Sequence, residues 1–174
     1  MKTVIQSVQS SARAYAVTVQ PDGKIVAAGY VRLSHQNDFA VARYNPDGTL
    51  DRSFSADGRV HSDFDGKDDV ARAVAIQSDG RIVVAGTATD VVDFLPDDED
   101  FGVERLNPDG ALDTSFSGNG KTSIGFGGAD RANAMVLQPD GKIVVAGTKG
   151  AIGTGDIALI RLNPDGTPDT SFGN

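Results

Sequence analysis

Two blocks of sequence each occur three times in the chain. The first block spans residues 16–29, 73–86 and 134–147, and the second follows in step at 43–54, 105–116 and 161–172. Gln20, Gln77 and Gln138 mark the repeat, with spacings of 57 and then 61 residues. A period of this length indicates one supersecondary unit per repeat, which buries its apolar surface by stacking on its neighbours.

Each unit predicts four short β-strands. Strands are expected at 73–77, 142–147, 38–44 and 120–126 in the units that show them most clearly. The run at 142–147 is continuously apolar, which is typical of a strand buried on both faces. Pro-Asp-Gly or Ser-Asp-Gly follows the first strand of every unit and favours a tight turn. Four short strands per stacked unit predict an all-β fold made of β-propeller blades.

The segments QPDGKIVVAG, RLNPDG and LDTSF resemble the delta-60 repeat (DUF5122-type), a bacterial family. The resemblance covers nearly the whole chain in three copies. It implies a β-propeller fold, favours a secreted or cell-surface location, and brings no catalytic residues with it. One propeller-repeat domain is expected over 1–174, with units at 11–66, 67–127 and 128–174 and a closing strand at 1–10.

The two ends of the chain together make up about one repeat. The chain stops where the fourth strand of the third unit is expected, and residues 1–10 have the pattern of such a strand. Three blades are fewer than the four to eight of known propellers. We therefore expect a homodimer with six blades, in which each N-terminal strand closes the last blade of the partner. A fragment of a longer array and a nine-bladed trimer are the alternatives.

Several charged and aromatic residues recur at equivalent positions, so they are expected to be structural. Each unit is expected to hold one Arg–Asp contact next to a phenylalanine used in blade packing. The residues are Arg43, Asp51 and Phe54; Arg105, Asp113 and Phe116; and Arg161, Asp169 and Phe172.

The connections between the second and third strands differ among the units and are expected on the same face as the links between blades. Because variable loops on a rigid scaffold commonly carry function, they predict a binding or scaffold module for an unknown protein or glycan. A carbohydrate-binding propeller, a glycosidase-like hydrolase and a subarray without independent function are the alternatives. The candidate contact residues are Tyr30, Arg32, His35, Asp90, Asp93, Phe94, Asp97, Asp98 and Glu99.

An Asp-x-Asp-Gly stretch in the first link between units is a candidate cation site. Its carboxylates are of the type that Ca²⁺ prefers, whereas a solvated acidic loop explains them without a metal. The residues are Asp63, Asp65, Asp68 and Asp69. No other cofactor is expected.

Composition argues against several classes of protein. The net charge of −8 disfavours nucleic-acid binding. Apolar runs are too short for a transmembrane helix, and the first residues lack the long apolar stretch of a signal peptide. The chain has no cysteine, only two histidines, and no spacing typical of a Ser-His-Asp site, so we expect it not to be an enzyme.

Overall fold

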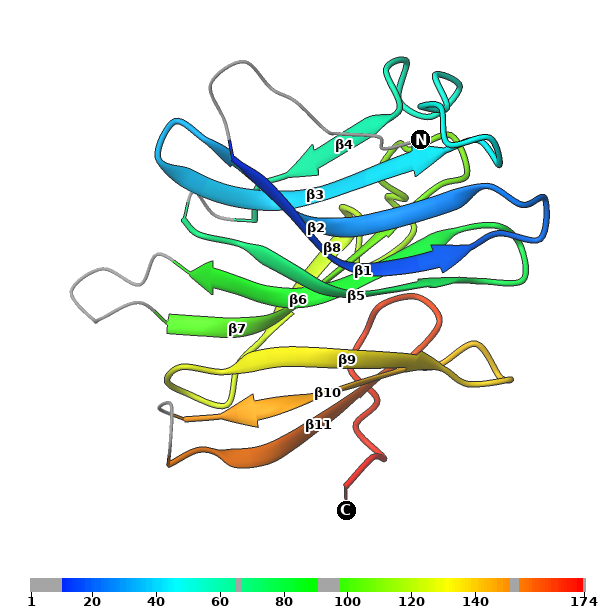
Figure 1. The fold of residues 1–174 in the computed structure, drawn as a ribbon. Helices are drawn as coiled ribbons and strands as arrows, with labels where there is room; N and C mark the ends of the chain where they lie inside the picture. Colours follow the sequence, from blue (N-terminus) through cyan, green and yellow to red (C-terminus); the bar gives the residue numbers. More distant parts are fainter. Residues whose placement is uncertain (1–10, 65–66, 91–97, 151–153, 174) are drawn as a thin grey trace.

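The computed structural model describes residues 11–64, 67–90, 98–150 and 154–173, which form three antiparallel sheets (Figure 1). The first sheet contains β1 (Ala12–Val19), β2 (Ile25–Leu33), β3 (Gln36–Tyr44) and β4 (Arg59–Ser62). The second contains β5 (Val70–Ile76), β6 (Ile82–Asp90), β7 (Asp98–Leu106) and β8 (Lys121–Ile124). The third contains β9 (Arg131–Leu137), β10 (Ile143–Lys149) and β11 (Asp156–Leu162).

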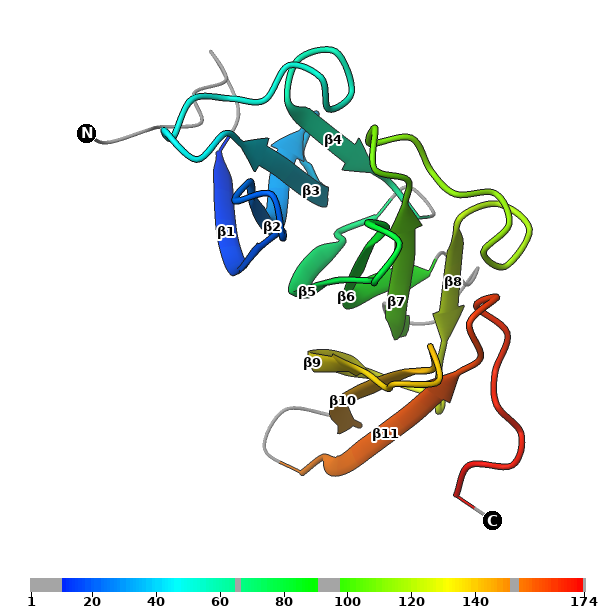
Figure 2. The ribbon, with the colours of Figure 1, turned by 90° about the vertical axis from the view of Figure 1, so that its right-hand side faces the viewer.

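Each sheet is a meander in which consecutive strands pair. The three sheets spread like a fan, with β1, β5 and β9 side by side along its inner edge (Figure 2). The fourth strands β4 and β8 lie at the outer edge (Figure 2). The all-β fold and the four-stranded sheets of the first two repeats are therefore as the repeat predicts, while the third sheet has three strands among the described residues. Residues 1–10, the expected closing strand, lie outside the described residues.

Two apolar cores fill the spaces between successive sheets. The first lies between sheets one and two and contains Phe39, Val41 and Phe54 from one side and Ile82 and Leu106 from the other. The second repeats this arrangement between sheets two and three, with Phe101, Val103 and Phe116 facing Ile143 and Leu162. Stacking of one repeat on the next thus creates the core, as is general in repeat architectures.

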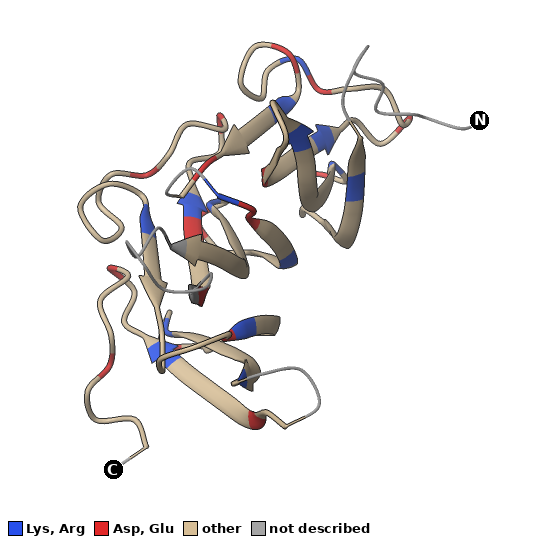
Figure 3. Cartoon of the chain, turned by 90° about the vertical axis from the view of Figure 1, so that its left-hand side faces the viewer, with Lys and Arg blue, Asp and Glu red and all other residues tan. Residues whose placement is uncertain are grey.

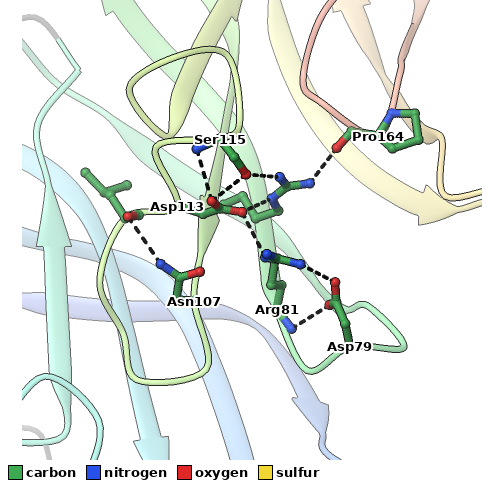
Figure 4. A network of polar contacts seen from close by, with 8 residues as sticks. Asp79, Arg81, Asn107, Asp113, Ser115 and Pro164 are labelled. Carbon is green, nitrogen blue, oxygen red and sulfur yellow. Dashed lines mark hydrogen bonds and ion pairs between the residues drawn. The ribbon is translucent and has the colours of Figure 1, made fainter.

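A polar cluster recurs in each repeat beside the end of its third strand. Arg43, Arg105 and Arg161 donate from Nε to Asp51, Asp113 and Asp169, each at 2.7 Å. Each guanidinium carbon lies 4.5–4.8 Å from the ring centroid of Phe54, Phe116 or Phe172. In the second repeat the aspartate also accepts from the Ser115 backbone N–H and hydroxyl and pairs with Arg81 (Figure 4).

The same arginines connect one sheet to the next. Nη1 of Arg43 donates to the Pro108 carbonyl and Nη1 of Arg105 to the Pro164 carbonyl, both at 2.5 Å. The N–H groups of Ser55 and Ser117 donate to the carbonyls of Asp109 and Asp165. These contacts fix successive sheets in the same relative position, which we refer to below as the inter-sheet lock.

The expected loop of the first repeat is shorter than its sequence indicates. Tyr30 and Arg32 are part of β2 and pair with Phe39 and Asn37 of β3, so the assignment of both to a loop is wrong. Strand β2 continues to Leu33 and β3 begins at Gln36, so only Ser34 and His35 form the turn between them.

Candidate functional site

A β-bulge interrupts the innermost strand of every sheet at the same repeat position. The bulged residues are Tyr15 in β1, Arg72 in β5 and Asn133 in β9. A bulge leaves one residue outside the ladder and changes the direction of its side chain. The repeats share this backbone feature while presenting an aromatic, a basic and an amide side chain on it.

Tyr15 and Arg72 are in contact across the gap between the first two sheets. The Arg72 guanidinium carbon lies 4.6 Å from the Tyr15 ring centroid, a cation–π geometry. The ring of Tyr30 is also close, with its centroid 6.1 Å from that of Tyr15. Tyr15 remains 44% exposed, and Asn133 is exposed as well. The inner edge of the fan thus carries an accessible aromatic–arginine cluster, which we refer to as the inner-edge cluster (Tyr15, Tyr30 and Arg72).

The β2–β3 turn has an unusual composition. Ser34 and His35 have φ angles of 46° and 84°. A two-residue hairpin with both φ values positive normally contains Asn or Gly. His35 therefore occupies a backbone conformation that disfavours its side chain, and strain of this kind is found preferentially at functional positions.

The link between the first two sheets joins this turn on the same face of the molecule. The Asn37 N–H donates to Oδ1 of Asp68 at 2.8 Å, and the Asp69 N–H donates to the Asn37 carbonyl. Asp69 is fully buried and accepts from the N–H groups of Phe64 and Thr89 at 2.8 and 3.0 Å. The variable connection and the inter-sheet link therefore form one hydrogen-bonded surface.

Burial raises the pKa of two carboxyl groups at this link. It raises the pKa of Asp69 to about 6, against the lowering effect of its two backbone hydrogen bonds. It also raises the pKa of Asp38, with further contributions from the carboxylates of Asp63 and Asp68. Asp38 and Asp69 are thus held away from solvent by the sheet.

These contacts bear on the candidate cation site. Asp68 and Asp69 accept backbone hydrogen bonds, and Asp65 lies outside the described residues. No group of three or more His, Asp or Glu side chains suited to a metal ion occurs in the part of the chain that the structure describes. Asp130 takes the place of Asp69 in the next link, where it accepts from the N–H groups of Phe126 and Gly150. A recurrent structural acceptor therefore accounts for Asp69 in the first link and for Asp130 in the second.

The sequence of this chain is similar to that of a known protein family. The chain matches the family described as "Domain of unknown function (DUF5122) beta-propeller" over residues 20–54, 77–116 and 138–172. The chain belongs to this family. The matches cover the three repeats in turn and confirm the resemblance seen in the sequence. No curated protein matches the chain.

Several of the predicted contact residues of this DUF5122 propeller lie outside the residues that the structure describes. Asp93, Phe94 and Asp97 fall outside the described residues, while Asp90 and Asp98 pair at the ends of β6 and β7. Glu99 forms an ion pair with Arg131 of the third sheet. No described segment is a helix of the length and apolarity needed to cross a membrane. Figure 3 shows the described Lys and Arg residues spread over all three sheets.

Sequence reasoning overlooked the inner-edge cluster apart from Tyr30. Tyr15, Arg72 and Asn133 each lie five residues before the repeated glutamine, within segments that are otherwise alike. The available signal in the sequence was that the residue at this one position differs among otherwise similar repeats. The bulge that gives this position its exposure is visible only in the strand register.

Proposed function

We propose that this DUF5122 propeller is a non-enzymatic binding module whose contact surface combines the inner-edge cluster with the variable connections beside it. One observation carries the proposal: three equivalent bulges present three different side chains on an otherwise repeated scaffold. Packing alone does not account for this difference, because Tyr15 and Asn133 are exposed.

The chemistry of the cluster supports a polar ligand with a flat or acidic part. Tyr15 offers an exposed ring face, and Arg72 offers a delocalised cation 4.6 Å from its centroid. Arginine donates in a fork geometry that matches carboxylates, and an aromatic ring provides contact area at small entropic cost. The link between the first two sheets adds the carboxyl of Asp68, which accepts from the Asn37 N–H.

A glycan is the second candidate ligand. Tyr15 is 44% exposed, and Tyr30 packs beside it at a centroid distance of 6.1 Å. Two adjacent tyrosines present apolar faces with hydroxyl groups, a combination suited to a sugar ring. The absence of tryptophan restricts such a site to these tyrosines.

The test is a selection with two probes, a glycan array and a random-peptide library, on the recombinant chain. We expect a ligand whose affinity falls at least about tenfold in Tyr15→Ala and in Arg72→Gln, the size of loss expected at a central contact. Arg52→Gln, at an exposed outer loop position, is the matched control and should bind normally. A glycan hit lost in Tyr15→Ala establishes the second candidate.

Two results contradict the proposal. The first is that every ligand from either library binds Tyr15→Ala and Arg72→Gln as well as the wild type. The second is turnover by the purified chain in a broad screen of glycosidase and esterase substrates, which would make it an enzyme.

A further inference from the structure

The first and last sheets of the chain expose apolar side chains on their outer faces. On the first sheet, Val17 and Val19 of β1 are 67% and 62% exposed; we refer to this surface as the leading face. On the third sheet, Val136, Ile157 and Leu159 are 61%, 84% and 49% exposed; we refer to this surface as the trailing face. Contiguous exposed apolar side chains on a soluble chain mark an interaction surface.

The equivalent positions on the inner faces show what covers such side chains. Val17 and Val19 correspond to Val74 and Ile76, which pack in the core between sheets one and two. They correspond also to Met135 and Leu137 in the second core. The leading face therefore has the side chains with which a sheet contacts the sheet before it.

The trailing face is the complementary half. Ile157 corresponds to Phe39 and Phe101, and Leu159 corresponds to Val41 and Val103. All four of these counterparts are at most 1% exposed, because the following sheet covers them. The trailing face therefore has the side chains with which a sheet contacts the sheet after it.

The inter-sheet lock is divided between the two outer faces in the same way. Arg161, Phe172 and Gly173 repeat the positions of Arg105, Phe116 and Ser117, which contact the next sheet. At the other end of the chain, Pro46 and Asp47 repeat Pro164 and Asp165, whose carbonyls receive those contacts. Among the described residues, Arg161 bonds to Asp169 and lies over Phe172, and no carbonyl takes the part of Pro108 or Pro164.

We infer that the leading face of one copy docks on the trailing face of a second copy and that two copies close a ring of six sheets. In this interface Arg161 donates to the Pro46 carbonyl of the other copy, and Ile157 and Leu159 cover Val17 and Val19. Each contact repeats one already made twice within the chain.

Ring closure follows from the repetition. The lock fixes the same rotation between successive sheets. Head-to-tail docking therefore adds the sheets of the second copy with the same rotation about the same inner edge (Figure 2). A repeated rotation closes into a ring or continues as a filament. Closed propellers have four to eight blades, so two copies fall within this range and three do not.

The second copy also completes the inner edge. In the ring, Tyr15 of one copy follows Asn133 of the other just as Arg72 follows Tyr15 within the chain. The six bulged side chains then surround one axis. This consequence for ligand binding depends on the proposed function, whereas the docking of the two faces does not.

The docking is tested by the mass in solution, measured by light scattering, of the wild type and of two double variants. Val17→Asp/Val19→Asp charges the leading face, and Ile157→Asp/Leu159→Asp charges the trailing face. We expect about twice the 18.1 kDa chain mass for the wild type and the single-chain mass for each variant alone. A mixture of the two variants should restore about twice the chain mass, because each supplies the intact face that the other lacks.

The control is Thr114→Asp/Asn119→Asp, which adds two charges at exposed positions away from both faces and should leave the mass doubled. Circular dichroism checks that every variant keeps its β-structure. A wild-type chain that stays at the single-chain mass overturns the inference. The inference is also overturned if either face variant, measured alone, still has about twice the chain mass, since the contact would then not be head-to-tail. Masses above two chains overturn the ring in favour of a filament.

Discussion

At the scale of single residues, Glu104 is the clearest conflict between burial and charge. It lies on β7, is fully buried, and neither carboxyl oxygen has a hydrogen-bond partner of ordinary geometry among the described residues. Burial raises its pKa to about 7, while the neighbouring Ser62 hydroxyl and the Lys121 charge act in the opposite direction. The first and third repeats have Ala42 and Ile160 at this position.

This burial predicts an effect of pH on stability. Because the folded pKa lies above the unfolded value, the folded chain holds a proton that the unfolded chain releases, and stability falls as pH rises from about 4.5 to about 7. Glu104→Gln removes this loss and should be more stable than the wild type at pH 8, by on the order of 3 kcal/mol. Urea unfolding of both chains at pH 5 and pH 8 measures the difference. An equal difference at the two pH values would show that Glu104 stays ionised in the folded chain.

At the scale of elements, the Arg–Asp clusters differ in how well they are enclosed. The side chains of Arg105 and Asp113 are each 7% exposed, whereas that of Arg161 is 21% exposed. Each aspartate keeps a second cation, Arg81 or Lys142, so the two sites are closely matched. They differ in that Arg105 also donates to the Pro164 carbonyl of the next sheet, whereas Arg161 reaches no proline carbonyl among the described residues.

We expect Arg105→Met to lower the free energy of unfolding by about 3 kcal/mol, because it leaves a buried carboxylate partly unpaired. Arg161→Met should cost about 1 kcal/mol, as expected for a more exposed pair. Both are measured by urea unfolding in the Val17→Asp/Val19→Asp chain, so that assembly does not bury Arg161. If the two substitutions lower the free energy of unfolding equally, the inter-sheet contact of Arg105 makes no measurable contribution to stability.

The strands and their grouping into sheets follow from the sequence because each repeat carries the same apolar runs and Asp-Gly turns. The bulges do not, since one added residue such as Arg72 leaves the apolar pattern of its strand nearly unchanged. The loop predicted around Tyr30 and Arg32 was wrong for a related reason. Polar residues next to a turn pair as readily as apolar ones when the opposite strand is in register.

At the scale of the whole molecule, the described residues contain two complete inter-sheet contacts, and each outer face carries the residues of half of such a contact. Two cores are shared between neighbouring sheets, so each inner face is stabilised by its neighbour. The outer faces have the same chemistry without the neighbour. The inferred docking would couple stability to assembly, because the contact between two copies would repeat the contact that holds the sheets of one copy together.

This coupling predicts that stability depends on protein concentration. When two folded chains unfold to two separate chains, a tenfold rise in concentration stabilises the folded pair by about 1.4 kcal/mol, from mass action alone. The urea midpoint of the wild type should therefore rise steadily over a hundredfold concentration range. The Val17→Asp/Val19→Asp chain should unfold at a midpoint independent of concentration, because its leading face no longer docks, while Thr114→Asp/Asn119→Asp should behave as the wild type. A wild-type midpoint that does not move with concentration would show that the sheets of one chain are stable without a second copy, and the outer faces would then have no part in holding the fold.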